Sequence, residues 1–276
     1  MRLKLKYITK QKGLLLPLHY NSILQALIYK TFSKELAASL HDEGFTLNNR
    51  HFKLFNFSRI LNRGRKVSGD NLKTLKQQVG INEDFYFISK RNAAIEEALY
   101  FENSIEFYFS SPKDILIEDI GNKAITTQKG TLLGQDIFIA SIEVMPEPKF
   151  SNKMNIKMIS PMTVYSTMKT KEGRSKTYYY SPYEKEFSKL VQRNAQKKYQ
   201  LITGNVSSGT LKITPLYFTE KRNRTVVYFK NTRIEGWTGV FVLEGDVNLI
   251  KVTYEAGLGS KNPEGFGMWK IYTKRV

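Results

Sequence analysis

The sequence contains no cysteine and only three histidines. The lack of cysteine excludes disulfide bonds, thiolate catalysis and zinc sites built on thiolates. His19, His41 and His51 form neither an HxxxH nor an HExxH pair, so the sequence predicts no metal site and no cofactor. No run of about 20 apolar residues is present that could span a membrane. The GxSxG and Walker A patterns are also absent, which argues against a serine hydrolase and a P-loop enzyme.

Positive charge is what the sequence has in excess. Its 276 residues include 43 Lys and Arg against 25 Asp and Glu, which gives a formal net charge of +18. A compact chain tolerates this self-repulsion best beside an anionic partner, and nucleic acid is the commonest one. A generally basic, soluble surface is the plain alternative. A membrane-surface role is a further alternative, but no cationic amphipathic helix supports it, so we expect no membrane association.

The first half of the chain predicts six strands and three helices. The strands are expected from period-two alternation or from aromatic-rich and apolar runs at 2–7, 52–57, 85–88, 105–109, 115–117 and 137–144. Helices are expected behind the capping residues Asn21, Ser33 and Asn92, the last of them holding Ala98 and Leu99. Gly44 is the expected stop of the helix that begins behind Ser33, because glycine can adopt positive φ. The polar, basic stretch at 62–82 is interpreted as a long hairpin excursion. The alternating, basic first residues are unlike a signal peptide, so we expect a cytoplasmic protein.

The second half repeats this order of elements. Its strands are expected at 155–158 and 162–165 together, then at 211–218, 226–229, 240–243 and 266–271. Ser181, followed by Pro182 and by Glu184 three residues after the cap, predicts the start of a helix. A shorter helix is expected between Asp246 as its cap and Gly257 as its end.

The Pro-Glu-Pro run at 146–148 is interpreted as a linker between the two series. The order strand-helix-strand-strand-helix-strand is that of the ferredoxin-like arrangement. We therefore predict an α+β fold of two tandem ferredoxin-like domains, at residues 1–145 and 149–276.

The most distinctive motif is a glycine-rich run near the C-terminus. It reads Gly257-Leu258-Gly259-Ser260-Lys261-Asn262 and continues through Gly265-Phe266-Gly267. It does not fit the dinucleotide pattern GxGxxG, because position 262 is Asn. Between a helix and a closing strand, such a run predicts a loop whose backbone can approach a ligand closely. Its N–H groups would suit phosphate oxygens, and Lys261 adds charge. A glycine-rich turn without a ligand is the alternative.

His41 is the histidine with the most suggestive place in the sequence. It lies at an expected helix end, directly before Asp42 and Glu43. Histidine is the side chain best suited to exchanging protons near neutral pH. A solvated helix terminus is the alternative for His41, and even more so for His19 and His51.

These motifs together resemble a known family. The glycine-rich run is similar to the loop of the repeat-associated RAMP proteins, and most similar to that of Cas6, the CRISPR RNA-processing endoribonucleases. The segments 18–29, 40–41 and 52–58 resemble the first helix, the following turn and the next strand of that family. Ser160-Pro161 and the segment 181–199 resemble its second domain. The resemblance covers nearly the whole chain, and the histidine-bearing first half is what points to Cas6 in particular.

This resemblance implies a function and a set of catalytic residues. Cas6 proteins have two tandem ferredoxin-like domains and cut the CRISPR repeat without metal, leaving a 2′,3′-cyclic phosphate and a 5′-hydroxyl. Many use a Tyr, a His and a Lys, and the matching positions here are Tyr29, His41 and Lys53. His41 would act as base or acid, Lys53 would stabilise the phosphate charge, and Tyr29 would orient the reacting groups. Catalytic residues vary between branches of the family, so a core tyrosine and a solvated lysine stay open as alternatives.

The implied partner is CRISPR repeat RNA, with other CRISPR effector subunits as further partners of a monomer or homodimer. We expect RNA contacts in the cleft between the domains. The candidates are backbone or basic residues: Gly257, Gly259, Lys261, Gly265, Gly267, Lys153, Lys157, Arg174 and Lys176. Tyrosines 178–180 would stack on single-stranded bases, and the basic stretch 59–66 is a further candidate. The alternative function is a non-catalytic RAMP-type subunit that holds RNA without cutting it.

Overall fold

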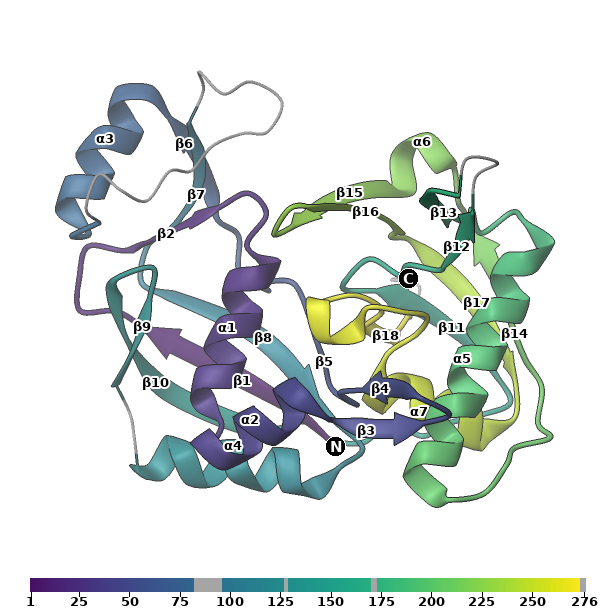
Figure 1. Ribbon diagram of the computed structural model, residues 1–276. Coiled ribbons are helices and arrows are strands. Elements are labelled where there is room, and N and C mark those ends of the chain that lie inside the picture. Colours follow the sequence, from purple (N-terminus) through teal and green to yellow (C-terminus); the bar gives the residue numbers. More distant parts are fainter. Residues whose placement is uncertain (82–95, 127–128, 170–172, 274–276) are drawn as a thin grey trace.

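The computed structural model describes residues 1–81, 96–126, 129–169 and 173–273. In this part of the chain an N-terminal and a C-terminal part lie side by side (Figure 1), each built on its own antiparallel sheet. Buried side chains form separate large clusters in the two parts, one drawn from residues 3–137 and the other from 154–269. No helix among the described residues has both the length and the apolar character needed to cross a membrane.

The N-terminal sheet has the strand order β5-β8-β1-β10-β9. Its strands pair antiparallel throughout and are β1 (Arg2–Ile8), β5 (Asn56–Phe57), β8 (Ser104–Ser110), β9 (Lys129–Leu132) and β10 (Gln135–Val144). In β1 the alternation of Leu3, Leu5 and Tyr7 with two lysines buries one face of the strand. Helices α1 (Asn21–Thr31) and α4 (Asp114–Thr126) place Leu24, Leu116 and their neighbours in the same core. Both helices lie on one side of the sheet (Figure 1).

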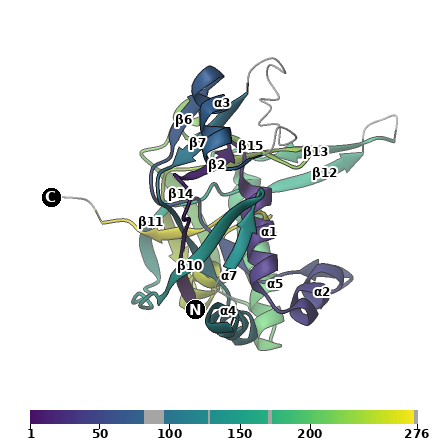
Figure 2. The ribbon, with the colours of Figure 1, turned by 90° about the vertical axis from the view of Figure 1, so that its left-hand side faces the viewer.

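Smaller elements surround this sheet. Helix α2 (Lys34–Asp42) leads into the hairpin β3 (Phe45–Leu47) and β4 (Arg50–Phe52). A three-stranded sheet contains β2 (Leu14–Pro17), β7 (Glu97–Phe101) and β6 (Arg65–Ser68), and α3 (Gly69–Gln78) packs on it. Figure 2 shows α2 standing away from the sheet beyond α1.

The C-terminal sheet has the strand order β14-β17-β11-β18, again antiparallel throughout. Its strands are β11 (Lys153–Met158), β14 (Leu211–Leu216), β17 (Val240–Gly245) and β18 (Trp269–Ile271). Helices α5 (Lys185–Thr203) and α7 (Val247–Ala256) contribute to the core of this part. Two hairpins extend from it: β12 (Tyr165–Lys169) with β13 (Ser175–Tyr179), and β15 (Arg224–Phe229) with β16 (Thr232–Trp237). The one-turn helices α6 (Glu220–Asn223) and η1 (Asn262–Glu264) complete it.

Several expected elements are confirmed. Strands β1, β8 and β10 cover the predicted segments. Strand β11 covers 155–158 of the strand predicted at 155–158 and 162–165 together, whereas of 162–165 only Tyr165 belongs to a strand, as the first residue of β12. Ser33 precedes α2, and Gly44 follows it at φ +62. Asp246 caps α7 by accepting hydrogen bonds from the amides of Asn248 and Leu249, and Gly257 ends that helix at φ +83.

Other expectations are wrong. The segment 115–117 lies in α4, because Leu116, Ile117 and Ile120 are buried at helical spacing. Ala98 and Leu99 lie in strand β7 instead of a helix, and the polar stretch after residue 62 contains α3. The predicted strand 52–57 is interrupted between β4 and β5, and the closing strand starts only at Trp269. The strand at 85–88 and the cap at residue 92 lie outside the described residues.

Two predicted helix starts are also displaced. Helix α5 begins at Lys185 behind Glu184, four residues after Ser181. The carboxylate of Glu184 still accepts a hydrogen bond from the Ser181 amide, so the two residues interact as predicted although the first turn is not helical. Helix α1 is preceded by Tyr20, and Asn21 is its first residue. The Asn21 side chain donates a hydrogen bond to the glycine-rich loop instead of capping the helix.

Candidate active site and glycine-rich loop

Tyr29, His41 and Lys53 come together at the ends of α1, α2 and β4. The rings of Tyr29 and His41 lie edge to face, with 6.5 Å between their centroids. The Nζ of Lys53 donates a hydrogen bond to the backbone carbonyl of His41 at 2.7 Å, so it also serves the unpaired C-terminal end of α2. Gly44 permits this approach, since a Cβ there would lie 2.6 Å from the carbonyl oxygen of Phe52.

His41 is presented to solvent. Its neighbour Leu40 is buried in the core, and the His41 side chain is 81% exposed. Its Nδ1 lies 2.8 Å from a carboxylate oxygen of Asp42. A carboxylate that accepts from Nδ1–H favours the tautomer with a free lone pair on Nε2, which is the form that accepts a proton.

Tyr29 and Lys53 are both partly buried, with opposite effects on charge. Burial raises the pKa of Tyr29, whose ring packs edge-on against Phe32 and Phe55, so its hydroxyl stays protonated at neutral pH. Burial lowers the pKa of Lys53, and the nearby Asp42 opposes that shift. A hydroxyl donor, an imidazole and an amine therefore lie close together at one exposed edge.

A basic stripe on α5 adjoins this edge and was not predicted. Lys189, Arg193 and Lys197 recur every four residues along the helix, so they share one face. Burial lowers the pKa of Lys197, and the positive charges of Arg50 and Arg193 lower it further. Arg50 of β4 therefore lies close enough to the stripe to repel Lys197. Helical spacing of the three basic residues was the signal in the sequence. The stripe extends the positive surface from the β3–β4 hairpin onto the C-terminal part.

The glycine-rich loop is packed between the two parts of the molecule. Gly257, Gly259, Gly265 and Gly267 are all buried and all have positive φ, between +67 and +86. A Cβ on Gly265 would lie 2.6 Å from the ring of Phe57, and one on Gly267 would lie 2.0 Å from the carbonyl oxygen of Leu258. Glycine is required here because the backbone is left-handed and closely enclosed.

The loop is bound by α1 through side-chain amides. Asn21 donates to the carbonyl of Glu264 at 2.8 Å, and Gln25 donates to that of Pro263 at 2.7 Å. We expected the N–H groups of the loop to be open to phosphate oxygens. For two of them this is wrong, because the amide of Gly265 donates to the carbonyl of Asn262 and that of Gly267 donates to the carbonyl of Pro161. The loop joins the C-terminal part to the helix that carries Tyr29.

A buried lysine holds the loop from the other side. Lys198 of α5 is only 3% exposed, and its ammonium donates to Gly257 O at 2.7 Å, Gly259 O at 3.1 Å and Asn262 Oδ1 at 2.6 Å. All these acceptors are uncharged, and burial lowers the pKa of Lys198 to about 7. Lys198 was not predicted as a site residue, although it continues the apolar stripe of Phe187, Val191 and Ala195.

The other predicted RNA contacts lie on separate elements. Lys153 and Lys157 alternate with buried residues of β11, so they face outward from its sheet, and Lys153 pairs with Glu244 at 3.2 Å. Arg174 and Lys176 are exposed on the β12–β13 hairpin. Lys261 in the glycine-rich loop pairs with Glu264 at 3.1 Å and lies over the ring of Tyr165.

The remaining histidines lie elsewhere. The ring of His51 is bonded at 2.7 Å to the carbonyl of Glu43, and that of His19 packs against Tyr228. Within the described ranges, no group of three or more His, Asp and Glu side chains is arranged to hold a metal ion.

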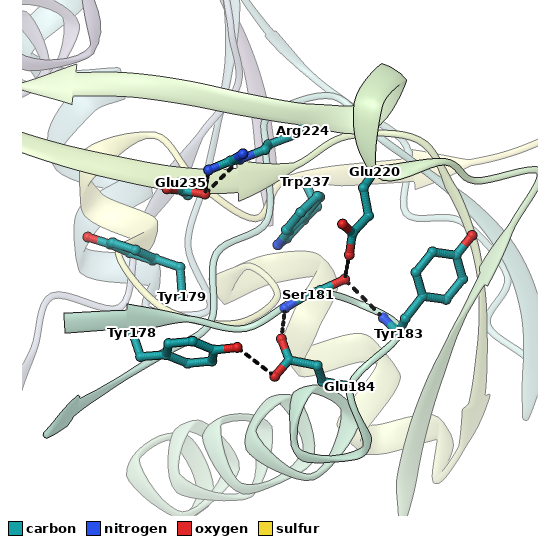
Figure 3. Close-up of a pocket in the computed structure, with 9 residues that line it drawn as sticks. All are labelled: Tyr178, Tyr179, Ser181, Tyr183, Glu184, Glu220, Arg224, Glu235 and Trp237. Atoms are coloured by element: carbon teal, nitrogen blue, oxygen red, sulfur yellow. Dashed lines mark hydrogen bonds and ion pairs between the residues drawn. The ribbon is translucent and has the colours of Figure 1, made fainter.

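A separate cavity of about 380 Å³ lies in the C-terminal part (Figure 3). Aromatic rings, carboxylates and one arginine line it: Tyr178, Tyr179, Ser181, Tyr183, Glu184, Glu220, Arg224, Glu235 and Trp237. None of these residues belongs to the group of Tyr29, His41 and Lys53. The cavity is therefore a second candidate site.

Comparison with known proteins identifies relatives over nearly the full length of the chain. Residues 145–271 match the family described as CRISPR associated protein Cas6, C-terminal. A CRISPR-associated endoribonuclease Cas6 of Pyrococcus furiosus is 27% identical over 265 residues, which cover 95% of this chain and 86% of that protein. The CRISPR-associated endoribonuclease Cas6 1 of Methanocaldococcus jannaschii is 26% identical over 97% of this chain and 91% of its own.

Solved structures agree with this similarity. One described as CRISPR associated protein Cas6 has a TM-score of 0.70 and 25% sequence identity, with 99% of each chain covered. Another, described as an RAMP protein binding different RNA substrates, has a TM-score of 0.72 at 18% identity, with 99% of this chain and 100% of that chain covered. The second likeness concerns the fold alone.

Proposed function

We propose that this chain is a Cas6-type endoribonuclease that cuts CRISPR precursor transcripts within the repeat, without metal, as its similarity to Cas6 proteins over nearly its whole length supports. The observation that carries the proposal is the convergence of Tyr29, His41 and Lys53. The ammonium of Lys53 is bonded to the backbone of His41, and the ring of Tyr29 lies beside the imidazole. The two curated relatives are named endoribonucleases, which supports an enzyme over a purely RNA-holding subunit.

The proposal includes the domain organisation. Each part is a ferredoxin-like domain, at residues 1–145 and 149–276. The sheets support this. In chain order the four motif strands are β1, β5, β8 and β10 in the first part, and β11, β14, β17 and β18 in the second. In both sheets they lie side by side in the order second, third, first, fourth. The antiparallel pairing and the two helices that accompany each sheet agree with the ferredoxin-like pattern.

The chemistry needs three groups around one phosphate. His41, with Nε2 as its basic atom, takes the proton of the 2′-hydroxyl, whose oxygen then attacks the adjacent phosphorus. The bond from phosphorus to the 5′-oxygen breaks, that oxygen takes up a proton from solvent, and a 2′,3′-cyclic phosphate remains; His41 afterwards releases to solvent the proton that it accepted. Lys53 stabilises the charge that builds on the phosphate oxygens, and the protonated hydroxyl of Tyr29 donates a hydrogen bond to the reacting groups.

RNA reaches this edge along positive surface. The α5 stripe of Lys189, Arg193 and Lys197, together with Arg50, supplies charges beside the catalytic group. The predicted contacts at Lys153, Lys157, Lys261, Arg174 and Lys176 belong to the same proposal. The glycines of the loop contribute by holding α1 against the C-terminal part.

A cleavage assay with labelled repeat RNA in EDTA tests the function. Wild type should cut at one position, and His41→Ala should lose about 10²–10⁴-fold in rate while RNA binding is kept. His51→Ala is the matched control, because it removes an exposed imidazole from the adjacent hairpin, and it should retain activity. Equal cutting by His41→Ala contradicts the assignment of the base, and binding without any cutting by wild type favours the RNA-holding alternative.

A further inference from the structure

The cavity in the C-terminal part has the size of a small-ligand site. Its volume of about 380 Å³ lies within the range of about 300–1,000 Å³ that is usual for such pockets. Its walls come from segments far apart in the sequence: the end of β13 and the turn before α5, then α6, β15 and β16. Figure 3 shows these side chains arranged around a common space, with Trp237 at its centre.

The aromatic rings of the pocket are held in fixed positions. Trp237 is 4% exposed, and its Nε1 donates to the carbonyl of Tyr180 at 2.8 Å. The hydroxyl of Tyr179 donates to the carbonyl of Arg233, and that of Tyr183 to the carbonyl of Phe218. The N–H and O–H groups of these three rings are bonded to backbone carbonyls, so the rings present their flat π surfaces to the pocket. Such surface favours a planar ligand.

The polar groups of the pocket are mostly acceptors. Glu184 accepts from the Tyr178 hydroxyl and the Ser181 amide, and Glu235 pairs with Arg224. Glu220 is exposed and receives the Ser181 hydroxyl on Oε1, and Figure 3 shows it reaching from α6 toward Ser181. Oε2 of Glu220 and the remaining lone pair of Oε1 can both accept from a ligand. A carboxylate can only accept when ionised, so the preferred ligand edge carries N–H donors.

The charges separate the inside of the pocket from its rim. Three carboxylates against one guanidinium repel a phosphate from the interior. The elements that carry the pocket also bear exposed cations outside it, namely Lys176 on β13 and Lys221 and Arg222 on α6. A nucleotide therefore fits with its base inside and its phosphates outside.

We propose that this pocket takes one unstacked guanine of the bound RNA, with Glu220 facing its Watson–Crick edge. Guanine is the one RNA base with two adjacent donors, N1–H and N2–H, for a single carboxylate. Adenine and cytosine offer only an exocyclic amine, and uracil a single imino group. The inference rests on the proposed function, because it assumes that repeat RNA is the ligand, and it adds a subsite that selects sequence.

Replacement of each guanine of the repeat by inosine, one at a time, tests the subsite. Inosine keeps the ring and N1–H but lacks the 2-amino group. For wild type, one position should lose about tenfold in affinity, measured by fluorescence anisotropy. In Glu220→Gln the affinity for unmodified RNA should fall to a similar degree, and the inosine effect at that position should largely disappear. Glu118→Gln, an exposed carboxylate on α4, is the matched control and should behave as wild type.

A second pair of variants tests the stacking wall. Tyr179→Phe keeps the ring and should keep the affinity, whereas Tyr179→Leu should lose several-fold. The inference is overturned if no inosine substitution weakens binding, or if the penalty persists undiminished in Glu220→Gln. Repeat cleavage by the same wild-type preparation would then still support the proposed function. A wild type that neither binds nor cuts the repeat would overturn the proposed function itself.

Discussion

The ammonium of Lys198 lies 2.7 Å from the carbonyl oxygen of Gly257, inside the protein and without a carboxylate among its three acceptors. One cation thus fixes the glycine-rich loop to α5. The same loop is bonded by Asn21 and Gln25 of α1, the helix that carries Tyr29 two turns later. The arrangement of the candidate active site therefore depends on a contact chain that begins in the C-terminal part.

Replacement of Lys198 should destabilise the fold. Lys198→Met keeps most of the side-chain volume but leaves the carbonyls of Gly257 and Gly259 and the amide oxygen of Asn262 without this donor. We expect a loss of about 1–3 kcal/mol in the free energy of unfolding, measured by urea denaturation. Lys189→Met, on the exposed face of the same helix, should stay within about 0.5 kcal/mol of wild type. Equal effects of the two variants would contradict the role of Lys198.

The same lysine predicts a pH dependence of stability. Burial lowers its pKa from 10.5 to about 7, so above that pH the folded protein loses a proton that the unfolded chain keeps. The unfolded state then binds more protons, and the free energy of unfolding contributed by Lys198 rises with pH between about 7 and 10.5. Urea denaturation across this range should show the rise in wild type relative to Lys198→Met. A difference that is constant or falls with pH would contradict the prediction.

Alanine substitutions should have opposite effects on stability at an enclosed glycine and at an open one. At Gly267, φ is +86 and an added Cβ would lie 2.0 Å from the carbonyl oxygen of Leu258, so Gly267→Ala should strongly destabilise the protein. At Gly121 in α4 an added Cβ meets nothing within 4 Å, so Gly121→Ala should stabilise it by about 0.5–1 kcal/mol. Thermal unfolding measures both. A tolerated alanine at 267 would show that the loop is less enclosed than the structure indicates.

The sequence predicted those elements whose signals are local. The alternation in β1, the Asp246 cap and the stop at Gly44 each depend on a few neighbouring residues, and all were found. The run Ile115-Leu116-Ile117 resembles a strand over three residues, and only burial of Ile120 with Leu116 reveals the helix. Local pattern cannot separate a short apolar run in a helix from one in a strand.

The candidate site was predictable only in part. The resemblance supplied Tyr29, His41 and Lys53, and the structure places the three together. Lys198 escaped notice because a lysine in a basic helix is normally solvated, and its burial depends on the distant glycine-rich loop. The pocket around Trp237 combines residues from 178 to 237, and tertiary packing alone brings them together.

Loss of Lys53 should slow the chemical step more than it weakens RNA binding. Its charge lies beside His41, where charge develops on the phosphate in the proposed mechanism. Lys53→Met should reduce kcat by about 10²-fold, because an electrostatic partner of the transition state is removed. Lys73→Met, which removes an exposed lysine on α3, is the control and should retain kcat. Single-turnover cleavage at saturating protein measures the effect, and an unchanged rate would assign Lys53 to capping α2 alone.

The α5 stripe should determine part of the salt dependence of RNA binding. Each lysine or arginine that contacts a phosphate of single-stranded RNA releases counterions and adds about 0.7 to the slope of log affinity against log salt. Arg193→Gln with Lys197→Gln should therefore lower that slope by about 0.7 for each side chain that touches RNA. Lys73→Gln with Lys129→Gln removes the same charge from the far side of the N-terminal part, where α3 and β9 lie (Figure 1), and should leave the slope nearly unchanged. If both pairs lower the slope equally, the net charge of the protein and not the stripe governs binding.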